Sequence, residues 1–549
     1  MALFAELRRR NVLKVALLYV VASWLILWFV QNTGEVLGLP SSTNLFLPLL
    51  LVIGFPVALL FAWTYEITPS GLRKAINVEQ TQSIVYKTGQ KLNAAVAVLL
   101  VLGVLALLGE GLLPKFEFLV PAVPQGEAPV SENTPPEIRS LVLDNGLKII
   151  VWPDHDFPNV AMYNFVRVGG RNESPGVTGI SHFLENMMSL GTEEQQPGAH
   201  EQIIAAAGGW NYAYTSNDVT VYASGFPRSA LGAVFEVEAN RFAALQISPA
   251  LLEAGRRMAY SKRRSSVADN DFGMLYEQVR ATAFVAHPYQ FPVVGWPSDI
   301  ESLSAEDVGL WYQTHYAPNN RAMVFSGNVT AAEIFELSVK YFASLPAQDP
   351  PPSIRTIEPQ QQGSRHVLVN APVPTPLLHI AFNAGSTTDA SSLPLKLLLH
   401  ILVGNESSRL HRLLVEDEEL ALSVDGFQEE GLDPGLIYLY LTLPPDGDPA
   451  GVEQRILEEL QRVVDDGVTD AELKTARLFA LADFQEALST AAGVANVLGS
   501  YEVLQGGYES LFAAQNALAA VTATELRDSA AKVFRVENMT VGVLRQAEE

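Results

Sequence analysis

The pattern of apolar and polar positions changes near residue 115, and the part before it carries three long apolar stretches. These stretches span residues 12–30, 44–63 and 93–113. Each is close to the roughly 20 residues that a helix needs to cross the hydrocarbon core of a bilayer. Because three such runs follow one another closely, we predict three transmembrane helices and not buried core helices. Residues 1–115 would then form a membrane module.

Basic residues around these stretches predict their orientation. The loop at residues 31–43 holds no Lys or Arg. By the positive-inside rule the N-terminus is cytoplasmic, and everything after residue 113 lies outside, in the periplasm of a bacterial cell. The first stretch is too long for a cleaved signal peptide and has no small-residue cleavage site. We therefore expect an inner-membrane anchor. The basic residues that carry this prediction are Arg8, Arg9, Arg10, Lys14, Arg73, Lys74, Lys87 and Lys91.

Two segments of this region resemble a membrane module found before varied soluble domains in many proteobacterial proteins. They are "FAELRRRNVLKVALLYVVASWLI" and "GFPVALLFAWTYEITPSGLRK". The resemblance implies anchoring and no chemistry of its own. Residues 116–137, which include "PAVPQGEAPVSENTPPE", are rich in proline and acidic. This composition predicts a tether between the membrane and the remainder of the chain.

From residue 138 onward the pattern alternates between strands and amphipathic helices. The segment "SLVLDNGLKIIVWPD" predicts two strands around an Asp-Asn-Gly turn. A second proline-rich break at residues 346–363 separates residues 138–345 from residues 364–549, and the order of elements in the second part echoes the first. We predict an α+β protein of two homologous α/β-sandwich halves that form a clamshell. The helical segments expected are 179–190, 200–207, 229–244, 249–267, 394–403 and 408–416.

Composition narrows the function classes. The chain has 549 residues, 48% of them hydrophobic, and a formal charge of −24. Such an excess of acidic residues argues against a nucleic-acid partner, because phosphate binding needs clustered Lys and Arg. The mean hydropathy of +0.16 agrees with membrane segments. The chain contains no cysteine, which excludes disulfides, thiolate metal ligands and a cysteine nucleophile.

The most informative motif is "GVTGISHFLENMMSLGT", residues 176–192. On a helix, His182, Glu185 and Asn186 project from one face, because they stand at positions i, i+3 and i+4. The motif resembles H-x-x-E-H, the zinc signature of the insulinase/pitrilysin (inverzincin) family. In that family both histidines bind zinc, and the glutamate acts as general base on the zinc-bound water.

The resemblance extends from about residue 138 to the C-terminus. Segments such as "NDVTVYASGF", "AHPYQFPVVGWPSDIESLS", "HYAPNNRAMVFSGNV" and "GNESSRLHRLLVEDEELALSV" match family patterns in the family order. The short two-domain type, to which the subunits of mitochondrial processing peptidase belong, is the most similar. The fold of that family is therefore expected for this part of the chain.

Position by position, the resemblance implies a disrupted zinc site. His182 matches the first ligand and Glu185 the general base, but Asn186 replaces the second histidine. The third ligand, a glutamate in a later helix, corresponds to Lys262, with Arg263 beside it and Gly255 earlier on that helix. An amide is a poor zinc ligand and an ammonium group repels the ion, so no metal cofactor is expected. We hypothesise that the Lys262 ammonium stands in for the metal beside Glu185.

Two further family features are altered. The substrate-binding edge strand of the family has the sequence Asn-Ala-aromatic-Thr. Here the corresponding residues are Tyr212, Ala213, Tyr214 and Thr215, whose backbone still offers hydrogen bonds to an extended peptide. In the second half, an Arg and a Tyr that hold substrate in active members correspond to Val415 and Leu422. Some short family members lack these two residues as well.

Three functions remain open. The first is a non-catalytic subunit that partners an active homologue and binds peptides or unfolded segments. The second is an active zinc endopeptidase with unusual ligands, in which case zinc is the cofactor. The third is a stand-alone module that binds peptides or envelope proteins. No replacement metal site is evident, because the remaining histidines lack ligand spacing on one helix: His155, His200, His287, His315, His366, His379, His400 and His411.

Overall fold

The structure is a computed structural model that describes Ser23 and residues 65–68, 71–74, 138–192 and 194–547. The chain divides into two compact units, Met1–Val130 and Ser131–Glu549. In the first unit, β1 (Tyr65–Thr68) and β2 (Gly71–Lys74) form an antiparallel pair. The predicted membrane spans, apart from Ser23, and the predicted tether fall outside the described residues. Of the helices that are described, none is long and apolar enough to span a membrane.

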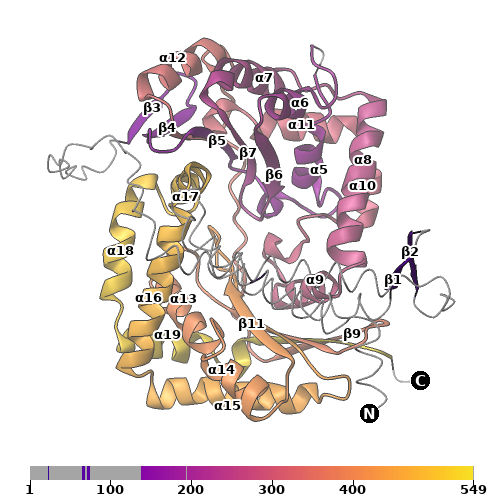
Figure 1. Cartoon of the computed structure of the whole chain (residues 1–549), viewed down its shortest axis with the longest axis vertical. Coiled ribbons are helices and arrows are strands. Elements are labelled where there is room, and N and C mark those ends of the chain that lie inside the picture. Colours follow the sequence, from indigo (N-terminus) through magenta and orange to yellow (C-terminus); the bar gives the residue numbers. More distant parts are fainter. Residues whose placement is uncertain (1–22, 24–64, 69–70, 75–137, 193, 548–549) are drawn as a thin grey trace. The chain divides into compact units, whose positions relative to one another are not determined.

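The N-terminal half of the second unit is built on a six-stranded sheet of order β3-β4-β8-β5-β7-β6 (Figure 1). Only β4 and β8 pair in parallel, and the predicted hairpin around the Asp-Asn-Gly turn is β3–β4. The strand β6 therefore lies at one edge of the sheet. The strands are β3 (Arg139–Val142), β4 (Lys148–Pro153), β5 (Asn159–Val166), β6 (Trp210–Thr215), β7 (Thr220–Pro227) and β8 (Arg321–Gly327).

The C-terminal half repeats this topology. Its sheet has the order β11-β12-β10-β13-β9. Read in reverse, from β9 to β11, this order corresponds strand for strand to β4-β8-β5-β7-β6 of the N-terminal half. Here too the only parallel pair, β9 with β13, joins the first and last strands of the half. The predicted pair of homologous α/β halves is confirmed. The strands are β9 (Arg365–Asn370), β10 (Leu377–Asn383), β11 (Ser423–Gln428), β12 (Leu436–Thr442) and β13 (Met539–Arg545).

Each predicted helical segment contains a helix, although α5 ends at Met187, before the predicted end at residue 190, and the remaining helices were not predicted. Helix α8 continues as a π-helical turn, Arg264–Ala268, and α14 continues as another, Arg412–Asp417. The helices of the N-terminal half are α5 (Ile180–Met187), α6 (Ala199–Ala206), α7 (Leu231–Ala243), α8 (Pro249–Arg263), α9 (Asp271–Ala283), α10 (Pro297–Ser302), α11 (Ala305–His315) and α12 (Ala331–Phe342). Those of the C-terminal half are α13 (Ser392–Leu402), α14 (Arg409–His411), α15 (Pro449–Asp466), α16 (Asp470–Ala487), α17 (Ala491–Leu504), α18 (Leu511–Ala520) and α19 (Ala523–Val533).

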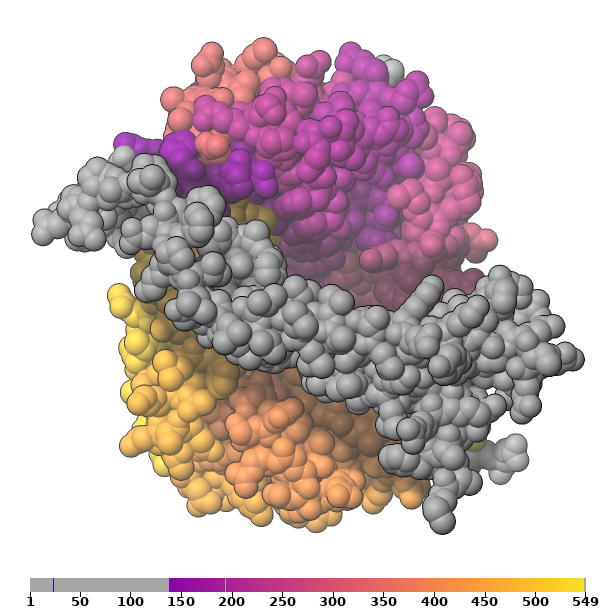
Figure 2. Space-filling view, in the orientation of Figure 1, coloured from indigo at the N-terminus to yellow at the C-terminus, as the bar shows by residue number. Residues whose placement is uncertain are grey.

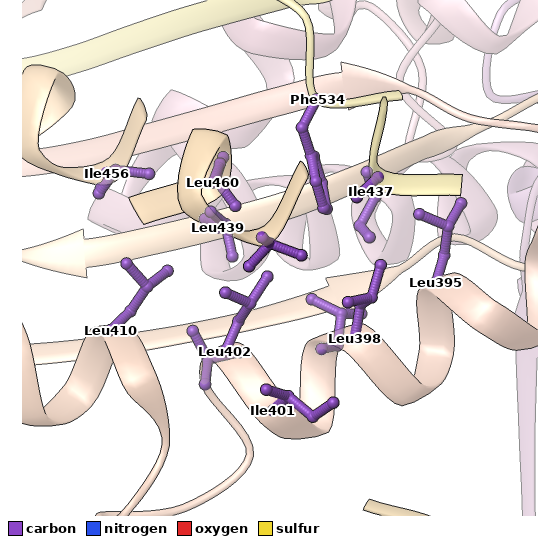
Figure 3. Close-up of a cluster of buried hydrophobic side chains, with 14 of the residues drawn as sticks. Leu395, Leu398, Ile401, Leu402, Leu410, Ile437, Leu439, Ile456, Leu460 and Phe534 are labelled. Atoms are coloured by element: carbon purple, nitrogen blue, oxygen red, sulfur yellow. The ribbon is translucent and has the colours of Figure 1, made fainter. Parts of the chain in front are cut away.

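Each sheet is covered on one face by helices of its own half. In the C-terminal half, apolar residues of α13 and α15 meet the strand β12 in a continuous core (Figure 3). Leu398 and Leu402 of α13, one turn apart, both lie in this core, as do Ile437 and Leu439 of β12. The helical period of α13 and the alternation of β12 thus supply matching apolar faces.

The other face of each sheet is covered by a helix from the opposite half. Helix α9 packs on β9, β10 and β13, and α17 packs on β5 and β8. A side chain at Gly499 of α17 would approach Cε2 of Phe165 to 1.9 Å, and one at Gly542 of β13 would approach Cγ2 of Val279 to 2.3 Å. Both glycines allow close approach of helix and sheet. The halves, coloured purple to pink and orange to yellow in Figure 2, are therefore interlocked.

The segment between β11 and β12 adds polar contacts between the halves. Glu429 accepts a hydrogen bond from the guanidinium of Arg280, and both side chains are buried. Asp433 pairs with Arg171 and with Nε2 of His287, the latter at 3.0 Å. Burial of these charges is tolerated because each has an oppositely charged partner within hydrogen-bond distance.

Candidate functional site

Helix α5 presents its three motif residues on one face, as their spacing predicts. It begins after Gly179, whose φ of 81° is a left-handed conformation that glycine adopts without strain. The buried carboxylate of Glu173 accepts hydrogen bonds from the backbone N–H groups of Gly179 (2.6 Å) and Ser181 (2.9 Å). Glu173 thus fixes the start of the helix. The sequence analysis missed this role, although an acidic residue shortly before a glycine-rich helix start is a usable signal.

The two residues at the expected zinc-binding histidine positions bind each other. The side-chain amide of Asn186 donates from Nδ2 to Nε2 of His182 (3.2 Å) and to its carbonyl oxygen (2.7 Å). The other ring nitrogen of His182, Nδ1, is buried and has no hydrogen-bond partner among the described residues. Burial, together with the positive charge of Lys262, lowers the pKa of His182 to about 4. The imidazole is therefore neutral at pH 7.

Glu185 is held by the edge strand. The hydroxyl of Thr215 on β6 donates a 2.6 Å hydrogen bond to its Oε2. Burial raises the pKa of Glu185 to about 7, against the opposing effects of this hydrogen bond and of the positive charge of Lys262. A carboxyl group with such a pKa exchanges protons readily at neutral pH. The structure thus brings together Glu185 and Thr215, which the sequence assigned to different parts of the site.

Lys262 lies near the end of α8, the helix that packs against α5. Its positive charge lowers the pKa of both His182 and Glu185. Its side chain is exposed, however, and within the described part of the chain it forms no ion pair closer than 4.0 Å. The positive charge therefore acts on Glu185 from the rim of the site and not through direct contact.

The neighbours of Lys262 on α8 provide no alternative ligand. Arg263 turns away and makes two hydrogen bonds to the carboxylate of Glu277, at 2.9 and 3.0 Å. Gly255 faces α5, and a Cβ atom there would approach Sδ of Met187 to 2.7 Å. A carboxylate at position 255 would consequently clash with the core, so the glycine serves close packing of the two helices.

The donor set at this position does not fit zinc. It offers one imidazole and one carboxylate, while the other two positions hold an amide and an ammonium group. Structural and catalytic zinc sites use at least three His, Cys, Asp or Glu ligands, and a ligating histidine normally donates its second N–H to a polar partner. Nδ1 of His182 lacks such a partner among the described residues, which also contain no other cluster of three potential ligands.

In the part of the chain that the structure describes, the strand β6 pairs with β7 alone and forms the edge of its sheet. Its residues alternate between the two faces. Ala213 packs toward α5 and Thr215 bonds to Glu185, whereas Tyr214 packs toward α17. Tyr212 is 46% exposed and donates to or accepts from the hydroxyl of Tyr163 at 2.9 Å. The strand thus presents backbone groups, an aromatic face and a face that adjoins the motif.

A pocket of about 160 Å³ opens between α5, α6 and β6. Glu185 and Asn186 form one wall, and the buried side chains of His200 and Arg241 form another. Arg241 donates to Glu238 at 2.6 Å, and His200 lies 3.1 Å from the same carboxylate. Burial raises the pKa of Glu238, but the charges of Arg241 and His200 outweigh this and bring it to about 2. His200 was expected only as a histidine at the start of a predicted helix without ligand spacing, so this network was not predicted from the sequence.

The two C-terminal positions carry no polar chemistry here. Val415 is partly buried against the core of the C-terminal half. Leu422 is 56% exposed, and its backbone N–H donates to the carbonyl of Thr442. An aliphatic side chain offers no charge or hydrogen bond to a substrate, so neither position can take the role of the family's Arg and Tyr.

Comparison with known proteins agrees with this architecture. Two family models match the chain, "Insulinase (Peptidase family M16)" at residues 153–295 and "Peptidase M16 inactive domain" at residues 302–478. The chain is 27% identical over 374 residues to a protein named zinc protease PqqE of Helicobacter pylori, covering 67% of this chain and 84% of that protein. It is 25% identical over 326 residues to the probable mitochondrial-processing peptidase subunit beta of Arabidopsis thaliana, covering 57% and 60%.

Solved structures give the same picture. The crystal structure of a protease from Helicobacter pylori matches with a TM-score of 0.72 and 25% identity, over 75% of this chain and 99% of that one. A structure described as a peptidase M16 inactive domain from Pseudomonas fluorescens matches with a TM-score of 0.69 at 14% identity, over 75% and 98%. The second likeness concerns the fold alone.

Proposed function

Given that this chain belongs to the insulinase (peptidase M16) family, we propose that it is a non-catalytic member that binds extended peptides and works with an active zinc peptidase. We further propose that residues 1–115 anchor it in the bacterial inner membrane, so that the two α/β halves face the periplasm. The anchor rests on the three apolar stretches and on the absence of basic residues from the loop at 31–43.

One observation carries the loss of catalysis. The amide of Asn186 occupies Nε2 of His182, while Lys262, at the third-ligand position of the family, offers a positive charge at the rim of the site and no anionic ligand. A cation beside the site raises the free energy of a bound Zn²⁺, and an amide contributes little in return. Both changes act in the same direction, so the substitution of either residue by itself would not restore a complete ligand set.

The edge strand β6 and the pocket beside it support peptide binding. Among the described residues, β6 pairs only with β7, which leaves the N–H and C=O groups along its outer side available. Extended peptides add to such edges as a further strand, and side-chain pockets then give specificity. The pocket beside Ala213 and the exposed ring of Tyr212 supply side-chain contacts of this kind.

A partner chain is supported by the interlocking of the halves. Because α9 and α17 each cover the sheet of the other half, opening the two halves would expose both cores. A closed chamber around a peptide on β6 therefore requires a second molecule. An active homologue of the same fold would provide both the chamber wall and the zinc chemistry.

The test is zinc content and peptidase activity of the full-length protein, beside Asn186→His, Lys262→Glu and the double variant. We expect the native chain and both single variants to be without stoichiometric zinc and inactive, and the double variant to bind about one zinc ion per chain. Restored activity with an added intact homologue would support the partner role. A native chain that binds zinc and cleaves peptides with Glu185 required would overturn the proposal.

One observation favours a second candidate, an active peptidase with unusual ligands. The pKa of Glu185, raised to about 7 by burial, suits a general base. The same zinc measurement separates the two candidates. Peptide binding without zinc, and without any effect of a homologue, would instead indicate a stand-alone binding module.

A further inference from the structure

Three aromatic side chains form a ladder on one face of β6. Trp210, Tyr212 and Tyr214 stand at alternate positions, so all three point to the same side of the sheet. Their rings stack in sequence, with centroids 5.5 Å apart for the first pair and 6.3 Å for the second. Trp210 is 40% exposed and Tyr212 46%. An aromatic row of this kind on an unpaired edge is unusual, because edges are normally protected by charge or proline.

Small residues on the neighbouring strand allow the ladder to lie flat. Trp210 pairs with Gly225 of β7, and a Cβ atom at Gly225 would approach Cε2 of the indole to 2.3 Å. Tyr212 pairs with Ala223, and its hydroxyl reaches over that residue to Tyr163 on β5. The rings are thus fixed by stacking and hydrogen bonding. Such rigid aromatic surfaces bind partners with little loss of side-chain entropy.

The opposite face of β6 has different chemistry. Asn211 and Ala213 line the pocket of about 160 Å³, together with the carboxylates of Glu185 and Glu201. The positive charge of Arg241 in this pocket is already neutralised by Glu238. One carboxylate oxygen of Glu201 is buried and has no hydrogen-bond partner among the described residues. This face therefore offers acceptors for a hydrogen-bond donor or a cation.

We propose that β6 selects amphipathic β-strand segments. In these segments, aromatic or β-branched residues at alternate positions contact the aromatic ladder. Lysine or neutral polar residues at the intervening positions contact the pocket. This inference rests on the proposed peptide binding and specifies its substrate class. A peptide added to β6 places each side chain directly opposite one of the strand, where aromatic and β-branched pairs are favourable. A shift of one residue would exchange the two faces, so the alternation also fixes the register.

Charge disfavours acidic segments at this pocket. A peptide carboxylate opposite Ala213 would face Glu201 and the partly protonated Glu185 in a partly buried pocket, with the positive charge of Lys262 only at its rim. Like charges in such a place repel one another more strongly than in water, because screening by solvent is reduced. A lysine at the same position would meet both carboxylates. The preferred segment is consequently apolar on one side and neutral or basic on the other.

The experiment measures binding of labelled ten-residue peptides to the full-length protein by fluorescence anisotropy. The reference peptide alternates Tyr or Val with Ser or Lys. A scrambled peptide of identical composition lacks the alternation, a second control replaces Lys by Asp, and a third carries N-methyl groups that block strand pairing. We expect the reference to bind about tenfold more tightly than each control, given the size of cross-strand pair energies.

Protein variants locate the effect. Trp210→Ser combined with Tyr212→Ser should reduce the affinity of the reference peptide to that of the scrambled one. Phe512→Ser, which removes an exposed aromatic residue from α18 of the C-terminal half, should leave it unchanged. Thermal unfolding of each variant verifies the fold. The peptide comparison on the native chain stands even if the double variant fails to fold.

The outcomes are distinguishable. Equal binding of reference and scrambled peptides would overturn this inference and leave the proposed peptide binding intact. Binding of none of the peptides would overturn both. Light scattering could also show that the native chain is a dimer and that the double variant is a monomer. A second copy of the chain would then occupy β6, and this result would also overturn the inference.

Discussion

Nδ2 of Asn186 lies 3.2 Å from Nε2 of His182 and 2.7 Å from the carbonyl oxygen of the same residue. One amide group thus donates hydrogen bonds to both the ring nitrogen and the backbone carbonyl of His182, which lies one helical turn earlier. Where the family motif has two metal-binding histidines, this helix has an internal hydrogen bond. Glu185, between them, keeps its contact with Thr215.

Glu185→Gln should change the pH dependence of stability. The pKa of Glu185 in the folded protein, about 7, lies above the ordinary value of 4.5, so the folded state binds more protons between these limits. The native chain consequently loses stability as the pH rises from about 4.5 to about 7. The variant has no such loss. Relative to the native chain, it should gain on the order of 2–3 kcal/mol between pH 4.5 and pH 8. Urea unfolding at a series of pH values measures this, with exposed Glu236→Gln as control.

Arg321→Met should stabilise the fold. Arg321 is fully buried, its guanidinium nitrogens have no hydrogen-bond partner in the described part of the chain, and it lies 4.1 Å from the ring centroid of Phe242. Burial lowers its pKa to about 10, a sign of the cost of the charge. An apolar side chain of similar length removes that cost, and we expect a gain of about 1–3 kcal/mol in unfolding free energy.

The matched change is Arg241→Met. Arg241 is also buried but pairs with Glu238, so its loss leaves a buried carboxylate without its main partner. It should destabilise the fold by about 3–5 kcal/mol. Thermal or urea unfolding compares the two variants. Destabilisation by both to the same extent would contradict the assigned difference between them.

Gly499→Ala should disrupt the contact between the halves. The added methyl group would lie 1.9 Å from Cε2 of Phe165, a fully buried ring that cannot move aside. Helix α17 would have to shift from the sheet, at a cost of about 3 kcal/mol. Gly232→Ala is the control, since nothing lies within 4 Å of a Cβ atom there. That change, in the exposed part of helix α7, should stabilise by roughly 0.5–1 kcal/mol.

Glu429→Gln should weaken the junction between β11 and the N-terminal half. Glu429 is the charged partner of buried Arg280 and also accepts a 2.6 Å hydrogen bond from Tyr276. Neutralising it leaves the Arg280 charge uncompensated and should lower the unfolding free energy by about 3 kcal/mol. The adjacent Glu430→Gln serves as control, because Glu430 is exposed and pairs with Lys396 only at 3.5 Å. Its effect should stay within about 0.5 kcal/mol.

Local features were predictable from sequence. The helical spacing of His182, Glu185 and Asn186 placed them on one face, and the Asp-Asn-Gly turn gave the β3–β4 hairpin. Lys262 was placed beside the motif through resemblance to the family, and its charge does act there. The sequence could not predict that the Lys262 side chain is exposed at the rim of the site. That depends on how α8 packs on α5, which Gly255 and Met187 determine together.

The sequence by itself therefore indicated the family and the duplicated halves through segments that match the family in order. It also showed that the expected ligand positions hold an amide and an ammonium group, because residue types can be read directly from the chain. Only the tertiary structure decided which halves cover which sheets, that Glu238 joins His200 and Arg241, and that the β6 rings lie flat over Gly225 and Ala223. Several of these contacts join residues far apart in the chain, such as Phe165 with Gly499 and His200 with Glu238. Their energies arise from burial and close packing, which no local pattern encodes.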